Sequence, residues 1–148
     1  MNAVRSLFRS SRPISWVNTA IPFAAAYFFS SGEVTGQLLV LTLFFLIPYN
    51  LLMYGINDVF DYESDMRNPR KGGIEGALLA PELHKTTLLW AYGLSVPFVA
   101  YALWASSGNI WALGVFALTL FAVVAYSVKG LRFKEIPFVD SITSSLHF

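Results

Sequence analysis

The sequence has no cysteine and little charge. Of its 148 residues only 13% are charged, about half the share that is usual in a soluble globular protein. The missing cysteines exclude disulfides, thiolate metal sites and cysteine nucleophiles. A net charge of +1 gives no reason to expect a nucleic-acid partner. What remains is a chain dominated by apolar residues, which make up 55% of it.

The apolar residues come in runs instead of an amphipathic stripe. Four runs cover residues 14–29, 38–56, 87–105 and 110–126. Each is close to the length of about 20 residues that a helix needs to cross the hydrocarbon layer of a membrane. Residues 137–142 read like the start of one more helix. The sequence therefore predicts an all-α, multi-pass transmembrane helical bundle of four spans and the start of a fifth.

The beginning of the chain allows a second interpretation. Arg5, Arg9 and Arg12 precede an apolar stretch, which is also the pattern of a signal peptide. Pro22 interrupts that stretch, and further apolar runs follow it. A first transmembrane helix is therefore the favoured interpretation.

The charges predict an orientation. Four spans place the N-terminus, residues 57–86 and the segment after Tyr126 on one side, and these hold all ten Lys and Arg residues. The loops on the other side, residues 30–37 and 106–109, carry only Glu33. Because basic residues concentrate on the cytoplasmic side, we expect the N-terminus in the cytoplasm and the protein in the cell membrane.

An acidic stripe follows the second run. On a helix Asp58, Asp61 and Asp65 share one face, Asn57 extends it, and Glu63 falls on the far side. Three unpaired carboxylates so close together repel one another where the dielectric constant is low. A divalent cation removes that repulsion, and all-oxygen ligands suit Mg²⁺, which commonly shares itself with a substrate phosphate. A continued second helix is thus predicted to carry a magnesium–phosphate site.

Basic residues surround this stripe in the sequence. They follow it directly and recur after the fourth run, at Arg67, Arg70, Lys71, Lys129, Arg132 and Lys134. Arg and Lys both suit phosphate, and the glycines at 72, 73 and 76 allow the intervening loop to fold over a ligand. Two simpler interpretations stay open. The acids can form a solvated loop paired with Arg67 and Arg70, and membrane topology alone accounts for the basic residues.

Several motifs carry a resemblance to a known family. Residues 55–65 resemble the first aspartate-rich motif, NDxxDxxxD, of the UbiA superfamily of membrane prenyltransferases. Arg12-Pro13 before the first run and Tyr126-Ser127 at the end of the fourth are similar to that family as well. Residues 68–76 and 132–141 are similar to its lycopene elongase branch.

The resemblance implies a helical bundle with a cavity open to lipid and a reaction that depends on Mg²⁺. Its metal ligands would be Asn57, Asp58, Asp61 and Asp65, and its catalytic residues Asp58, Asp61, Asp65 and Tyr126, the last stabilising an allylic cation. Its diphosphate contacts would be Arg12, Arg67, Lys71, Lys129 and Arg132. The implied substrates are dimethylallyl diphosphate and lycopene.

Other assignments remain open at this point. The acceptor can instead be an aromatic or quinone-type molecule, and a non-enzymatic, cation-binding membrane protein is a third possibility. The second aspartate-rich motif of the family is absent from these 148 residues, and Asp140 is too isolated to replace it. We therefore expect residues 1–148 to be the N-terminal part of one UbiA-like domain and to be inactive alone. Nothing in the sequence indicates an oligomeric state.

Overall fold

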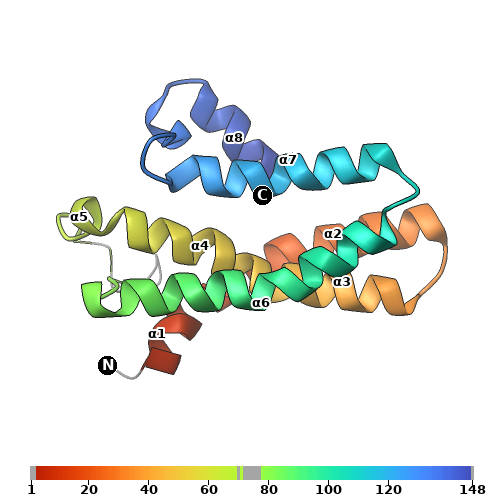
Figure 1. Ribbon diagram of the computed structural model, residues 1–148, viewed down its shortest axis with the longest axis horizontal. Coiled ribbons are helices and arrows are strands. Elements are labelled where there is room, and N and C mark those ends of the chain that lie inside the picture. The colour runs from red at the N-terminus through yellow and green to blue at the C-terminus, as the bar shows by residue number, and fades with distance from the viewer. Residues whose placement is uncertain (1–2, 70, 72–77, 148) are drawn as a thin grey trace.

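The computed structural model describes residues 3–69, 71 and 78–147, and within these ranges it contains helices and no strand. This confirms the all-α prediction (Figure 1). The α-helices are α1 (Ala3–Ser10), α2 (Trp16–Ser31), α3 (Gly36–Leu46), α4 (Pro48–Phe60), α5 (Tyr62–Asp65), α6 (His84–Ala105), α7 (Ile110–Ser127) and α8 (Val139–His147). Short 3-10 helices form at η1 (Pro13–Ser15), η2 (Pro81–Leu83) and η3 (Phe133–Glu135).

By length and composition alone, three helical segments in the described part of the chain can cross a membrane. They are Gly36–Phe60, Pro81–Ala105 and Ile110–Ser127, and they match the second, third and fourth predicted spans. The first predicted span forms helix α2, whose 16 residues extend about 24 Å at 1.5 Å per residue. α2 is therefore shorter than the other three segments.

The second span is broken in the middle by a proline. Pro48 has no N–H to donate, and the backbone at Ile47 leaves helical geometry with φ −118° and ψ −62°. The Asn50 side chain donates to the carbonyl oxygens of Phe45 (2.8 Å) and Leu46 (3.1 Å). Thr19 on α2 also donates to the Phe45 carbonyl at 2.7 Å. These side chains satisfy carbonyl groups at the break, which is what a buried kink requires in lipid.

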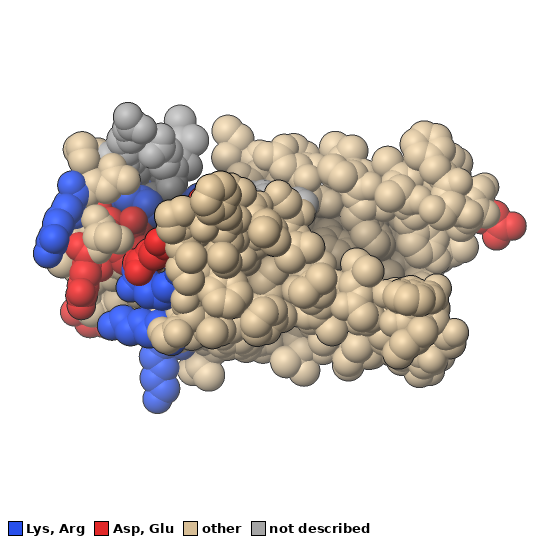
Figure 2. Space-filling view, turned by 90° about the horizontal axis from the view of Figure 1, so that it is seen from above, with Lys and Arg blue, Asp and Glu red and all other residues tan. Residues whose placement is uncertain are grey.

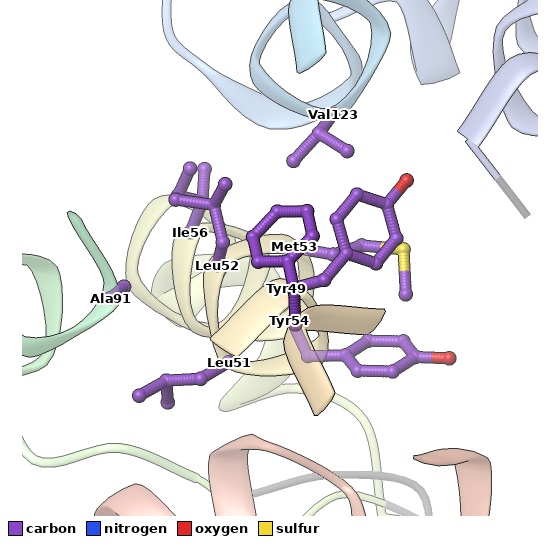
Figure 3. Packing of buried hydrophobic residues seen from close by; sticks show 9 residues of the cluster. Tyr49, Leu51, Leu52, Met53, Tyr54, Ile56, Ala91 and Val123 are labelled. Atoms are coloured by element: carbon purple, nitrogen blue, oxygen red, sulfur yellow. The ribbon is translucent and has the colours of Figure 1, made fainter. Parts of the chain in front are cut away.

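Helix α4 lies at the centre of the structure. Residues 48–56 are all buried, and α4 packs against α1, α3, α6 and α7. Figure 3 shows Ala91 of α6 and Val123 of α7 reaching the α4 cluster from different sides. The end of α4 is therefore held by several elements that are distant in the sequence.

The segment after α7 turns back along the bundle. Helix α8 packs against α7 and forms where the start of a further helix was predicted (Figure 1). Helix α1, which the sequence did not predict, packs against α4 and buries Ser6 and Ser10. The N-terminal segment is thus part of the folded structure around α4.

A close approach between α4 and α6 depends on a glycine. A Cβ atom at Gly55 would lie 3.2 Å from Thr87 Cγ2 and 3.8 Å from Ala91 Cβ. Small residues let membrane helices approach closely. A larger side chain at Gly55 must push α4 and α6 apart.

We expect Gly55→Leu to lower the free energy of unfolding by about 1–3 kcal/mol because it overpacks this contact. The measurement is thermal unfolding of the detergent-solubilised protein, expressed from its complete reading frame. Gly93→Leu is the matched control, since a Cβ atom at Gly93 on α6 meets nothing within 4 Å. Equal melting temperatures for the two variants would contradict the close contact.

Candidate active site

Charged side chains gather at one end of the structure. Figure 2 shows Lys, Arg, Asp and Glu together at that end, while the opposite end shows one small acidic area. The gathered charges come from the segment that follows α1, from the end of α4 and the segment that follows it, and from the turn between α7 and α8. The sequence predicted that these segments share one end, and the structure confirms it.

The acidic stripe does not lie on one continuous helix. Helix α4 ends at Phe60, Asp61 takes a turn conformation with φ −99° and ψ 1°, and α5 follows. The prediction of a continuous extension is therefore wrong at Asp61. The amide of Asp61 still donates to the Asn57 carbonyl (2.9 Å), and that of Asp65 to the Asp61 carbonyl (2.8 Å). Because this i to i−4 pattern continues through the turn, the spacing of the stripe survives the break.

The three aspartates are buried. Asp58 is 1% exposed, Asp61 8% and Asp65 8%. Glu63 is exposed, which agrees with its predicted position on the far side. Burial of three carboxylates requires compensating charge, because each buried anion loses its hydration.

Asp58 and Asp65 share one lysine. Lys71 Nζ lies 3.4 Å from Asp58 Oδ1 and 2.8 Å from Asp65 Oδ2. Arg12 Nη2 also reaches Asp58 Oδ1 at 3.4 Å, and its guanidinium lies 4.2 Å from the centre of the Tyr54 ring. The N-terminal segment and the segment after α5 therefore meet at one carboxylate.

Asp61 is paired from the other side of the site. Lys134 Nζ contacts Asp61 Oδ2, and Arg132 Nη2 lies 3.4 Å from Asp61 Oδ1. Lys134 also donates to Asn57 Oδ1 at 3.3 Å, and Ser127 Oγ donates to the same oxygen at 2.9 Å. The turn after α7 thus covers the end of α4.

Lys134 is the site residue that the sequence analysis missed. It was recognised only as one of several basic residues, and it was not among the assigned diphosphate contacts. Its position in η3 results from the left-handed backbone of Arg132, with φ 43° and ψ 50°. Arg12 has a similar backbone, with φ 48° and ψ 72°. Such conformations are uncommon outside glycine and often mark functional sites, but they are not readable from residue types.

Two predicted diphosphate contacts lie beside this cluster. Arg67 and Lys129 are exposed and line a cleft of about 190 Å³ together with Arg132 and Glu63. The simpler interpretation paired the acids with Arg67 and Arg70. In the described part of the chain, the aspartates pair with other basic residues instead of Arg67. Arg70 and residues 72–77, to which the glycine-rich loop belongs, lie outside the described part of the chain.

Tyr126 lines a cavity of about 180 Å³ that lies beside the site. The cavity is lined by Arg12, Met53, Tyr54, Asn57, Val123, Tyr126 and His147. Lys134 Nζ lies 5.9 Å from the centre of the Tyr126 ring. An aromatic face within about 6 Å of a positive charge attracts that charge. The structure therefore brings Tyr126, Asn57 and Arg12 to one space.

The donor atoms suit a divalent cation only in part. Asn57 and the three aspartates offer oxygen, which Mg²⁺ prefers. Asp58 Oδ2 is buried and makes no hydrogen bond of standard geometry to any described residue. However, no three acidic or histidine side chains within the described ranges are gathered closely enough to hold a metal ion. Basic residues neutralise the carboxylates instead, so a cation would have to displace some of them and take further ligands from a substrate.

Comparison with known proteins gives a consistent picture. The profile of the UbiA prenyltransferase family matches residues 19–148. The C(50) beta-cyclic carotenoids biosynthesis protein LbtBC of Dietzia sp. is 57% identical over 143 residues, which are 97% of this chain and 33% of that protein. The lycopene elongase/hydratase of Corynebacterium glutamicum is 54% identical over 153 aligned positions, covering 100% of this chain and 51% of that protein.

A more distant relative has the same name. The lycopene elongase/hydratase of Haloarcula japonica is 33% identical over 145 residues, 95% of this chain and 48% of that protein. The chain thus spans between one third and about half of the length of these relatives. No solved structure matches it significantly. The family match covers most of the chain and includes the acidic stripe at the end of α4, so the chain belongs to the UbiA prenyltransferase family.

Proposed function

We propose that this chain is the N-terminal part of one membrane prenyltransferase domain that transfers a dimethylallyl group from its diphosphate to lycopene, with Mg²⁺ as cofactor. The observation that carries the proposal is the buried acidic stripe, which meets four basic side chains beside the Tyr126 cavity. Carboxylates can hold the metal ion and neighbouring basic side chains can bind the diphosphate, so the two together suit a metal–diphosphate complex better than either kind of charge alone. The proposed location is the cell membrane, with this end of the bundle in the cytoplasm.

The residues have distinct roles in this proposal. Asn57, Asp58, Asp61 and Asp65 would hold Mg²⁺, which supplies positive charge to the diphosphate leaving group. The basic residues of the cluster would bind the diphosphate oxygens, and they are Arg12, Lys71, Arg132 and Lys134. Arg67 and Lys129 would contribute from the neighbouring cleft.

The transfer breaks one bond and forms another. The C–O bond of dimethylallyl diphosphate breaks, and its electron pair leaves with the diphosphate, whose charge the basic residues stabilise. A terminal double bond of the acceptor attacks the allylic cation and forms a C–C bond. The positive charge then lies on the acceptor and is removed by loss of a proton or by addition of water with release of a proton. The aromatic ring of Tyr126 would stabilise the allylic cation. Met53 and Val123 make the cavity wall apolar.

The relatives favour a carotenoid over the other acceptors. Their names refer to lycopene and C(50) carotenoids, and none refers to an aromatic or quinone-type acceptor. The cation-binding alternative predicts acids along a path in the middle of the membrane. Here the acids lie at the end of a span, beside basic residues, which supports phosphate chemistry.

We expect Asp61→Ala to abolish prenyl transfer while membrane insertion is retained. The variant removes the carboxylate that faces Lys134 and Arg132 and that would hold the metal. The complete reading frame is expressed in lycopene-producing cells, and pigments and membrane-bound protein are both measured. Glu82→Ala is the matched control, because Glu82 is an exposed carboxylate of η2 outside the site. If cells with Asp61→Ala produced the normal pigments, Asp61 would not be a required metal ligand.

We expect Lys134→Met to tighten the binding of Mn²⁺ about tenfold when diphosphate is absent, equivalent to about 1.4 kcal/mol. The physical reason is that Lys134 neutralises Asp61 and donates to Asn57 Oδ1 in the structure, and so competes with a cation for both groups. The measurement is electron paramagnetic resonance of free Mn²⁺, with Mn²⁺ as a probe for Mg²⁺.

Lys85→Met is the control for this measurement, because Lys85 is exposed at the start of α6 and its substitution removes the same charge.

Lys134→Met should also weaken the binding of inorganic diphosphate. Unchanged Mn²⁺ affinity in Lys134→Met would show that the lysine does not compete with the cation.

A further inference from the structure

A buried imidazole lies beside the candidate active site. His147, at the end of α8, is 3% exposed and lines the 180 Å³ cavity together with Tyr126 and Asn57. The proposed transfer leaves a cation on the acceptor, and a proton is released when that cation is quenched. The metal ligands and diphosphate contacts assigned above do not include a group that takes up this proton. The wall of the cavity is where such a group would meet the acceptor.

Three contacts hold His147 in one orientation. Its ring Nδ1 lies 2.6 Å from the carbonyl oxygen of Thr143, and because a carbonyl only accepts, Nδ1 carries the hydrogen. The ring meets the Tyr126 ring edge-on, with the ring centres 4.9 Å apart. The hydroxyl of the buried Tyr49 donates to the backbone carbonyl of His147 at 2.6 Å. Helices α4, α7 and α8 therefore all contribute to the position of this imidazole.

The orientation makes the imidazole of His147 a base. With the hydrogen on Nδ1, the neutral ring keeps a lone pair on Nε2. Burial favours the neutral ring, because a buried positive charge loses its hydration. A neutral imidazole is a suitable proton acceptor near neutral pH. Its ring contacts that of Tyr126, which would face the allylic cation, so the base lies next to the reacting carbons.

The other described residues of the cavity wall are poorer proton acceptors. Arg12 carries a positive charge, and Asn57 has an amide, which is not basic. Tyr54 and Tyr126 carry phenols, which stay protonated near neutral pH. The three aspartates beside the cavity are paired with basic side chains. Among the residues that the structure describes around this cavity, the imidazole is therefore best suited to accept a proton.

We propose that His147 is the base that ends the reaction, and that its Nε2 takes a proton from the carbon next to the cationic carbon of the acceptor. This rests on the proposed function. In this step the C–H bond breaks, its electron pair forms a C=C bond with the cationic carbon, and the proton forms an N–H bond at Nε2. The imidazolium returns its proton to water when the product leaves. The base thus favours an alkene over the alcohol that water would form with the same cation.

The base is tested with His147→Asn in membranes that contain the complete protein. Asparagine keeps a donor for the Thr143 carbonyl but has no basic nitrogen. With lycopene and dimethylallyl diphosphate as substrates, we expect kcat to fall about 100-fold. The KM for the diphosphate should stay within about twofold, because the base acts after that substrate is bound. The share of alcohol among the products should rise, since the cation then waits for water; isotopically labelled water identifies this oxygen.

A second histidine offers a matched control. His84 Nε2 lies 3.0 Å from the carbonyl oxygen of Leu79, and its ring meets the ring of Tyr62 edge-on with centres 5.1 Å apart. These contacts are of the same kind as those of His147, but His84 is not among the residues that line the cavity. We expect His84→Gln, which keeps a donor for its carbonyl, to leave the rate and the ratio of alkene to alcohol unchanged.

Tyr49→Phe gives a second measurement that does not replace the base. It removes the hydroxyl that holds the His147 carbonyl and so loosens the end of α8. We expect a smaller fall in kcat, about tenfold or less, together with a rise in the share of alcohol. If His147→Asn does not accumulate in membranes, this variant decides, and an unchanged ratio of alkene to alcohol in it would overturn the assignment.

The outcomes separate this proposal from the proposed function. Wild-type protein that prenylates no lycopene would contradict the proposed function itself. An active wild type that forms only alcohol would overturn the assignment of the base alone. So would alkene formed at the wild-type rate by His147→Asn, which would leave the departing diphosphate as the proton acceptor. A lower rate with an unchanged ratio of alkene to alcohol would also overturn it, because a purely structural role lowers both products alike.

Discussion

Ion pairing at the end of α4 determines how the rest of the structure is arranged. Three buried carboxylates on adjacent turns are unfavourable alone, and each is paired with a basic side chain from another part of the chain. Arg12 comes from the N-terminal segment, Lys71 from the segment after α5, and Lys134 from the turn after α7. Segments that are distant in the sequence are thereby brought to one end of the bundle.

The apolar packing around α4 supports this pairing. α4 is buried along its first nine residues, and its kink at Pro48 is held by Asn50 and Thr19. The close approach of α6 at Gly55 fixes another side of the helix. Because α4 is held so closely, the direction of the aspartates at its end is fixed before any ligand binds. The carboxylates themselves would therefore lose little conformational freedom on binding, while the basic side chains paired with them would have to move.

Much of the fold could be predicted because membrane spans are encoded in long apolar runs. The ends of α6 and α7 were predicted within a few residues, and the common location of the basic segments followed from the number of predicted spans. The stripe of Asp58, Asp61 and Asp65 was predicted from helical spacing, although the helix breaks at Asp61. Helix α1 and the role of Lys134 were not predictable, because both depend on packing and on left-handed backbone at arginine positions. Local residue patterns do not contain that information.

The origin of the paired charges also has a consequence for biosynthesis. Arg12 is translated 46 residues before Asp58, so a partner for the most deeply buried carboxylate already exists when that carboxylate leaves the ribosome. The partners of Asp61 are translated 71 and 73 residues after it, once α7 has been made. During that interval Asp61 must remain hydrated at the membrane surface. The C-terminal end of α4 therefore reaches its final position only after the turn that follows α7 has been made, and the insertion of α7 completes the site at the end of α4.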